Sequence, residues 1–202
     1  GDLLCINNTR VLPARLYGKT ASGASVEILL LKRLQGDVWE ALAKPGKKVK
    51  AGAEITFSPL LKAYVLEPGD EGTRIIRFVY QGSFQNLLEE TGEMPLPHYI
   101  RQKLGDGERY QTVYSEVSGS AAAPTAGLHF TPQLLQSIEE KGIAIAKILL
   151  HVGLGTFRPV KTETIEQHKM HAEYFEVTQE AAEKINETKR SGGRVIFSAD
   201  RR

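Results

Sequence analysis

Six short β-rich runs between residues 10 and 82, each ended by its own turn signal, constrain this chain more than any other feature. Strands that recur about every 8–12 residues are typical of a small barrel or sandwich. Every boundary has its own breaker of regular structure, so the strand count follows from the breakers. The runs begin at Val11, Val26, Val38, Glu54, Leu61 and Arg74, and the breakers include Gly18, Gly36, Pro45, Pro59, Pro68 and Gly82.

From residue 83 onward, apolar residues at helical spacing alternate with strand-like runs. Three helices are expected, from Phe84 to Gly92, from the Thr131 cap to Gly142, and from the Thr178 cap to Gly192. The run from Ile143 to Leu150 predicts a strand buried on both faces, and the run from Arg194 to Ser198 predicts a further strand. This alternation is typical of an α/β layer with a largely parallel sheet.

The composition is that of an ordinary globular chain, with 202 residues of which 41% are hydrophobic. These values exclude disordered, collagen-like and low-complexity classes, and the length fits one large or two small domains. Lys and Arg number 26 against 24 Asp and Glu, a net charge of +2. Any contact with nucleic acid must therefore come from a local basic patch.

No apolar run approaches the roughly 20 residues of a membrane span, and no signal peptide is found. We therefore expect no association with a membrane. The single Cys5, in the apolar run from Leu3 to Ile6, excludes internal disulfides and a Cys-based zinc site. It predicts a buried, inert thiol in a reducing, cytoplasmic setting. Strand-like runs reach both ends of the sequence, so we expect it to be part of a longer polypeptide.

All five histidines follow residue 83, which places proton chemistry at neutral pH in that half. His129 ends a segment of small residues that starts at Gly119, directly before a predicted helix, where anions and substrates are often bound. A surface loop is the alternative interpretation of this segment. His151 opens a glycine turn at the carboxyl end of a predicted strand, where α/β sheets bind ligands. A structural role for His151 is equally compatible with the sequence.

Two further clusters carry charge. His168, His171 and Glu173, together with His151, are metal-ligand types, but their spacing matches no helical metal motif, and a solvated or substrate-facing segment is preferred. The second cluster is a basic run that either keeps the barrel soluble or contacts phosphates. It consists of Lys44, Lys47, Lys48 and Lys50, extended by Arg10 and Arg15.

Several of these segments, taken in order, resemble one family. The similar segments are Asn7 to Leu16, Gly92 to Pro97, Glu108 to Tyr114, Gly119 to Phe130, Leu150 to Phe157 and Met170 to Glu173. The sequence resembles the S-adenosylmethionine:tRNA ribosyltransferase-isomerase family of queuosine biosynthesis, up to about Ile196. The resemblance implies a two-domain α/β (α+β) fold with a six-stranded antiparallel β-barrel inserted in an α/β barrel-like domain. Residues 10–82 would form the barrel, and residues 1–9 and 83–202 the incomplete catalytic domain.

The resemblance also implies a reaction. The enzyme would transfer and isomerise the ribosyl part of S-adenosylmethionine onto 7-aminomethyl-7-deazaguanine at the wobble position of tRNA. The products would be epoxyqueuosine-tRNA, adenine and methionine. S-adenosylmethionine is consumed as a substrate, so no cofactor and no metal are expected, and we expect a cytoplasmic monomer with tRNA as its partner.

This chemistry needs acid–base groups with a pKa near 7, for which histidine is suited. The catalytic candidates are His129, His151, His171 and Glu93. The candidates for binding substrate are Arg109, Tyr110, Tyr114, Thr125, Gly127, Phe130, Gly153, Gly155, Phe157, Arg158 and Glu173. Two other functions stay open, a non-catalytic RNA-binding module and a metal-dependent hydrolase built on His151, His168 and His171.

Overall fold

The computed structural model describes residues 1–96, 100, 104–153, 164 and 172–198. The chain divides into two units, one made of Gly1–Val11 and Glu108–Arg202 and the other of Leu12–Gly107. The first unit is discontinuous because the second is inserted between its first and second segments.

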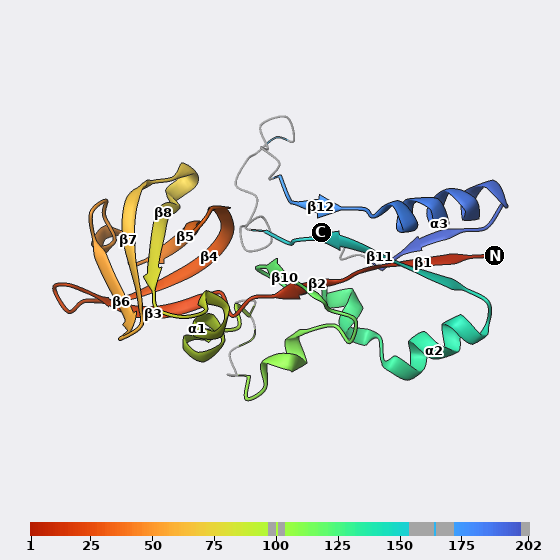
Figure 1. Cartoon of the computed structure of the whole chain (residues 1–202), viewed down its shortest axis with the longest axis horizontal. Coiled ribbons are helices and arrows are strands. Elements are labelled where there is room, and N and C mark those ends of the chain that lie inside the picture. Colours follow the sequence, from red (N-terminus) through yellow and green to blue (C-terminus); the bar gives the residue numbers. More distant parts are fainter. Residues whose placement is uncertain (97–99, 101–103, 154–163, 165–171, 199–202) are drawn as a thin grey trace. The chain divides into compact units, whose positions relative to one another are not determined.

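A closed antiparallel barrel makes up most of the unit Leu12–Gly107 (Figure 1). Its strands pair in the order β4-β5-β8-β7-β6-β3, and pairing of β3 with β4 closes the ring. This confirms the predicted six-stranded antiparallel barrel. The strands are β3 (Arg15–Thr20), β4 (Ser25–Gln35), β5 (Val38–Lys44), β6 (Glu54–Ser58), β7 (Leu61–Pro68) and β8 (Arg74–Tyr80).

Alternation along the strands builds the barrel core, since successive side chains point to opposite faces. On β7, Leu61, Ala63 and Val65 are buried, whereas Tyr64 and Leu66 are exposed. Helix α1 (Phe84–Thr91) begins at Ser83, whose hydroxyl accepts a hydrogen bond from the Asn86 N–H, and it places Phe84 on the barrel. The Phe84 ring lies 5.0 Å from that of Phe78 and 5.8 Å from that of Trp39, measured between centroids.

The predicted strand from Val11 to Tyr17 is wrong as one element. The structure has β2 (Thr9–Val11) in one unit and β3 in the other. Pro13 lies between them, and proline has no backbone N–H to donate to a strand ladder.

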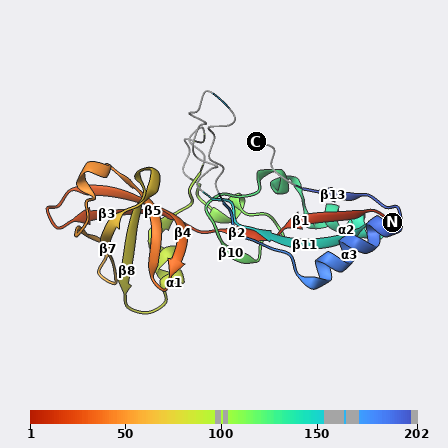
Figure 2. The same cartoon turned by 90° about the horizontal axis from the view of Figure 1, so that it is seen from above.

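The discontinuous unit contains a four-stranded sheet in the order β12-β11-β1-β13 (Figures 1 and 2). Strand β1 (Leu3–Asn7) is parallel to both β11 (Ala144–Leu150) and β13 (Val195–Phe197), and only β12 (Phe175–Glu176) is antiparallel. The largely parallel sheet is as predicted. A separate pair joins β10 (Val117–Ser120) in parallel to β2.

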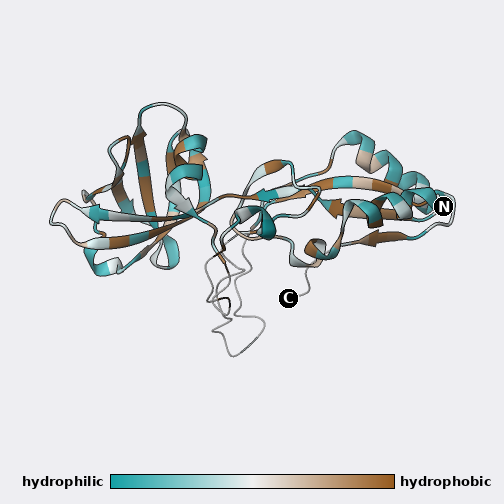
Figure 3. Ribbon diagram, turned by 90° about the horizontal axis from the view of Figure 1, so that it is seen from below, coloured by the Kyte–Doolittle hydropathy of each residue, from teal (hydrophilic) through white to brown (hydrophobic). Residues whose placement is uncertain are grey.

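Two helices cover opposite faces of this sheet, and both begin at the predicted threonine caps (Figure 1). Helix α2 (Pro132–Glu140) contributes Leu135 and Ile138 to a cluster with Leu4 and Ile6. Helix α3 (Gln179–Arg190) contributes Ala181 and Ile185 to a second cluster around Leu3, Cys5 and Ala146. The strands carry most of the hydrophobic residues, and the helices are largely hydrophilic (Figure 3).

The predicted burial of β11 on both faces is wrong, because Ala144 and Lys147 are exposed. The Lys147 ammonium is ion-paired with Glu116, so a polar pair occupies this part of the sheet face that α2 covers. The strand that does have two buried faces is β1. Cys5 on β1 is buried as predicted, and burial raises the pKa of its thiol.

The remaining short elements lie in connections. They are β9 (Gly92–Glu93) and the 3-10 turns η1 (Gly46–Lys48), η2 (Asp70–Gly72), η3 (Gly107–Tyr110) and η4 (Thr125–His129). Strand β9 pairs with β3, and α1 packs on the barrel, so residues 83–107 group with the barrel in the two units. Within the described part of the chain, no helix is long and apolar enough to cross a membrane.

Candidate functional site

His151 lies directly after β11, at the carboxyl end of the parallel strands. The Asn7 side chain extends the strand ladder to this point. Its Nδ2 donates to the Leu150 carbonyl at 2.9 Å, and its Oδ1 accepts from Leu150 N at 3.0 Å and from Thr9 N at 3.1 Å. A side-chain amide thus replaces a backbone partner where β1 ends, and it fixes the residue that precedes His151.

Thr9 and Tyr174 hold the imidazole of His151. Its Nδ1 lies 2.7 Å from the Thr9 hydroxyl oxygen, and Thr9 is 1% exposed. The ring stacks on Tyr174 with centroids 5.7 Å apart and an angle of 25° between planes. The backbone N–H of His151 also donates to the Tyr174 carbonyl at 2.9 Å. Burial lowers the pKa of His151 from its ordinary value of 6.5, so the neutral ring is the major form at pH 7.

The Thr9 hydroxyl assigns the proton on this neutral ring. Within the described chain, His151 Nδ1 is the sole hydrogen-bond partner of Thr9 Oγ1. A buried hydroxyl proton without an acceptor is costly, so we infer that Thr9 donates to Nδ1. The neutral ring then carries its hydrogen on Nε2, which makes Nε2 a hydrogen-bond donor.

Gly119 lies against the Nε2 side of the ring. The register of β10 with β2 shifts between Ser118 and Ser120, so Gly119 is the extra residue of a β-bulge. Its φ of 156° is one that residues with a side chain rarely adopt. A Cβ added at Gly119 would lie 2.5 Å from His151 Nε2 and 2.6 Å from Cε1. The small-residue segment therefore permits close approach of the imidazole to the backbone.

Hydrogen bonds join this bulge to the turn after His151. Ser120, which is fully buried, donates from Oγ to the Ala122 carbonyl at 2.7 Å and accepts from Val152 N at 3.0 Å. The Ala121 N–H donates to the Val152 carbonyl at 2.9 Å. Gly153 N donates to the Glu173 carboxylate at 2.8 Å. Four segments of the chain, including the one that carries His151, thus meet here. Together they form the His151 cluster, which consists of Asn7, Thr9, Gly119, Ser120, His151, Gly153, Glu173 and Tyr174.

The other predicted residues of this unit lie outside the His151 cluster. His129 is exposed at the end of η4, and among the described residues no hydrogen bond joins it to the cluster. Tyr114 and Phe130 pack edge to face in the α2 cluster, with centroids 6.1 Å apart. Gly127 is packed against the Tyr114 ring, where a side chain would collide with it. Thr125 begins η4.

Arg109 is exposed on η3, and Tyr110 beside it is buried. Glu93 lies on β9, in the barrel unit. His171, Gly155, Phe157 and Arg158 lie outside the described residues, and so does His168 of the hydrolase hypothesis. Among the residues that are described, no three His, Cys, Asp or Glu gather to hold a metal ion.

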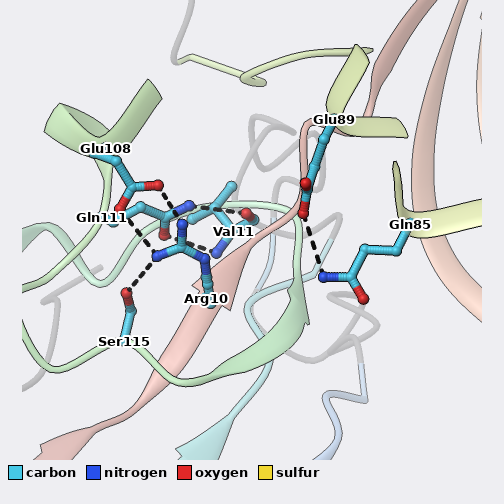
Figure 4. A network of polar contacts seen from close by, with 7 residues as sticks. All are labelled: Arg10, Val11, Gln85, Glu89, Glu108, Gln111 and Ser115. Atoms are coloured by element: carbon cyan, nitrogen blue, oxygen red, sulfur yellow. Dashed lines mark hydrogen bonds and ion pairs between the residues drawn. The ribbon is translucent and has the colours of Figure 1, made fainter. Parts of the chain in front are cut away.

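The two arginines of the predicted basic patch are engaged with carboxylates. The guanidinium of Arg10 binds Glu108 and donates to Ser115 Oγ at 3.2 Å (Figure 4). Arg15 Nη1 lies 2.9 Å from a Glu27 carboxylate oxygen. The four lysines of the patch are not ion-paired to any residue that the structure describes. They are Lys44, Lys47, Lys48 and Lys50.

Sequence reasoning did not single out the residues that fix this region. Asn7 and Thr9 directly follow the apolar run of β1, and polar residues at that position were the available signal. Gln111 was missed in the same way. Its side-chain amide accepts from Val11 N and donates to the Val11 carbonyl, both at 2.9 Å, and so extends β2 (Figure 4).

With this geometry in place, comparison with known proteins assigns the class. The chain belongs to the family of queuosine biosynthesis proteins, whose family model matches residues 1–198. Among individual proteins, it is 58% identical over 198 residues to the S-adenosylmethionine:tRNA ribosyltransferase-isomerase of Desulfitobacterium hafniense. The alignment covers 97% of this chain and 58% of that relative, so the chain spans less than two thirds of its length.

A solved structure is also similar in sequence. It is the crystal structure of the S-adenosylmethionine tRNA ribosyltransferase of Thermotoga maritima, which is 33% identical to this chain. The match covers 97% of this chain and 50% of that one, with a TM-score of 0.36.

Proposed function

We propose that this chain acts as an S-adenosylmethionine:tRNA ribosyltransferase-isomerase. It transfers the ribosyl part of S-adenosylmethionine to 7-aminomethyl-7-deazaguanine at the wobble position of tRNA, and it releases adenine and methionine. The observation that carries the proposal is the 58% identity, over 97% of the chain, to a relative of that name. The proposal includes a cytoplasmic monomer that consumes S-adenosylmethionine and needs no further cofactor.

The His151 cluster supports a specific role in this reaction. The adenine anion is a poor leaving group, so its departure from the ribose needs a donor that supplies a proton or a hydrogen bond. His151 is neutral, and the Thr9 contact leaves its hydrogen on Nε2. A neutral imidazole placed in this way acts as a hydrogen-bond donor that stabilises the negative charge developing on the departing base. We assign that role to His151 and keep His129 and His171 as candidates for the base that removes a proton from the 5′ carbon.

Charge and aromatic groups complete the proposed site. Glu173, fixed through Gly153 N, is a counter-ion for the sulfonium or the acceptor amine. Arg109 and Arg158 are candidates for binding the methionine carboxylate. Of the aromatic candidates, Tyr110 is buried and Phe130 packs against Tyr114 in the α2 cluster, so Phe157 is the one we keep for contacting the sulfonium with a ring face.

The test is product release. The protein is incubated with S-adenosylmethionine labelled in its methionine part and with tRNA that carries the deazaguanine acceptor, and free adenine and methionine are measured. Release of both, dependent on that tRNA, is expected. Binding of RNA without any release would instead support the RNA-binding module. Replacement of His151 or His129 by Ala, with the fold retained, should each lower the rate by about 10²–10⁴. Turnover near that of the unmodified protein in both variants would contradict the assigned roles.

A further inference from the structure

The outer surface of the barrel has a hollow of about 900 Å³ that the proposed chemistry does not use. It lies over β3, β4, the end of β5 and β6, wholly within the unit Leu12–Gly107. Its aromatic and charged lining comes from Tyr17, Lys19, Glu27, Lys44 and Phe57. Sites that bury small organic groups have volumes of about 300–1,000 Å³, so the hollow has room for one nucleotide.

Tyr17 supplies an aromatic ring that is accessible to a ligand. It is 51% exposed on β3, while its neighbour Leu16 is fully buried in the barrel. The next residue, Gly18, brings β3 directly onto β6, since a Cβ there would lie 2.8 Å from both Ile55 and Phe57. Phe57 is half-buried and packs on Phe78 of the core, with centroids 5.9 Å apart. The hollow thus has a closely packed floor and an exposed aromatic side.

Its charge is positive. Lys19 and Lys44 are exposed, and neither is ion-paired to any residue in the described part of the chain. Among the described residues that line the hollow, Glu27 is the one acid, and it is bound by Arg15 at 2.9 Å. Three further lysines follow Lys44 within six residues, at 47, 48 and 50. Two cations, Lys19 and Lys44, therefore line the hollow together with the exposed Tyr17 ring, and three more follow Lys44 in the sequence.

We propose that this hollow binds an unpaired nucleotide of the RNA substrate, whose base stacks on Tyr17 and whose phosphates contact Lys19 and Lys44. Aromatic platforms flanked by lysines are how proteins bind single-stranded nucleic acid. The lysines continue past the hollow into η1, so they match a polynucleotide with successive phosphates and not a free nucleotide. The inference rests on the proposed function for its choice of tRNA as the RNA.

The experiment measures RNA binding without S-adenosylmethionine, so that its result does not depend on turnover. Fluorescence anisotropy compares three labelled ligands: the anticodon stem-loop of the tRNA, a fully paired hairpin of equal length, and adenosine monophosphate. The variants are Tyr17→Ala, Tyr17→Phe and the double variant Lys19→Ala with Lys44→Ala. Tyr64→Ala is the matched control, because Tyr64 is 37% exposed on β7 of the same barrel and does not line the hollow.

The stem-loop should bind more tightly than the paired hairpin. Tyr17→Ala should weaken stem-loop binding by about 5- to 150-fold, the range for loss of one base stack, while Tyr17→Phe and Tyr64→Ala leave it within about 2-fold. The lysine variant should reduce the slope of log K against log salt by roughly 0.7 for each phosphate that is no longer neutralised. Equal effects of Tyr17→Ala and Tyr64→Ala would overturn the proposal, and so would equally tight binding of the monophosphate. Tyr17-dependent RNA binding by a protein that releases no adenine would refute the proposed function and leave this inference standing.

Discussion

Replacement of Thr9 by Val tests the hydrogen bond on which the assignment of His151 depends. Valine has nearly the same shape as threonine, so the change removes the hydroxyl and leaves the packing in place. The variant lacks the 2.7 Å bond from the Thr9 hydroxyl to His151 Nδ1, and Thr9 is 1% exposed. An acceptor left without its donor costs about 1–3 kcal/mol when buried. The imidazole is only half-buried, so water can reach part of it, and we expect a loss of about 1–2 kcal/mol in the free energy of unfolding.

The same variant should change the protonation of His151. A donor at Nδ1 stabilises the neutral ring with its hydrogen on Nε2, so loss of that donor raises the pKa of His151 and lets the other tautomer form. Nitrogen-15 NMR of the histidine ring reports the pKa and the tautomer of His151 directly. Urea unfolding of the same samples reports the free energy.

Thr9→Ser is the matched control, because it keeps the hydroxyl and should keep the Nε2–H tautomer. The reasoning would be refuted if Thr9→Val left the tautomer and the pKa of His151 unchanged. It would also be refuted if the native ring already carried its hydrogen on Nδ1. Loss of stability alone, with no change at the ring, would mean that Thr9 has only a structural role.

Three further predictions concern the same unit. Gly119→Ala should lower the free energy of unfolding by about 2 kcal/mol or more, because of strain at positive φ and the collision with His151. Gly153→Ala is the control: its added Cβ has its nearest neighbour at 3.6 Å, and it should cost under about 0.5 kcal/mol. Similar urea midpoints for the two variants would contradict this prediction. Because the pKa of His151 is lowered in the folded state, the unfolded chain takes up the imidazole proton at a higher pH than the folded chain. The free energy of unfolding should therefore fall as the pH drops below 6.5. His151→Gln should reduce this pH dependence in urea unfolding. The Arg194 guanidinium holds the pKa of Asp2 at about 2 against an ordinary 3.8. The contribution of this ion pair to stability is therefore complete above pH 3.8 and disappears as the pH falls toward 2. Carboxylate NMR titration of the Arg194→Met variant should show the Asp2 pKa rising.

Local signals in the sequence were sufficient for most of the secondary structure. Five of the six predicted barrel strands match observed ones, because breakers such as Pro45 and Pro59 act through their own dihedral angles and missing donors. The threonine caps of α2 and α3 were equally predictable, since a cap bonds an N–H only three residues away. The exception was the strand predicted from Val11 to Tyr17. Pro13 separates it into two strands that belong to different units, and Gly18, the breaker expected to end it, lies within β3.

The division of the chain depended on long-range packing. The sequence analysis placed residues 83–107 with the second half because the six strand-like runs end at Gly82 and helical spacing begins at Phe84. In the structure Phe84 packs on barrel aromatics and β9 pairs with β3, which groups them with the barrel. Periodicity shows that a segment forms a helix but not which surface that helix covers. The domain boundaries drawn from the sequence stay a prediction.

The histidine and the glycine turn of the candidate site were visible in the sequence, but their surroundings were not. His151 could be singled out because it follows an apolar run that ends at a sheet edge. Thr9, its hydrogen-bond partner, is 142 positions away in the chain, and Gly119 meets the ring through a bulge in a different pair of strands. Residue types and local spacing determine which elements form, because those interactions reach only a few residues. Which hydroxyl faces Nδ1, and so which nitrogen holds the proton, is decided only when parallel pairing of β1 with β11 brings the ends of distant strands together.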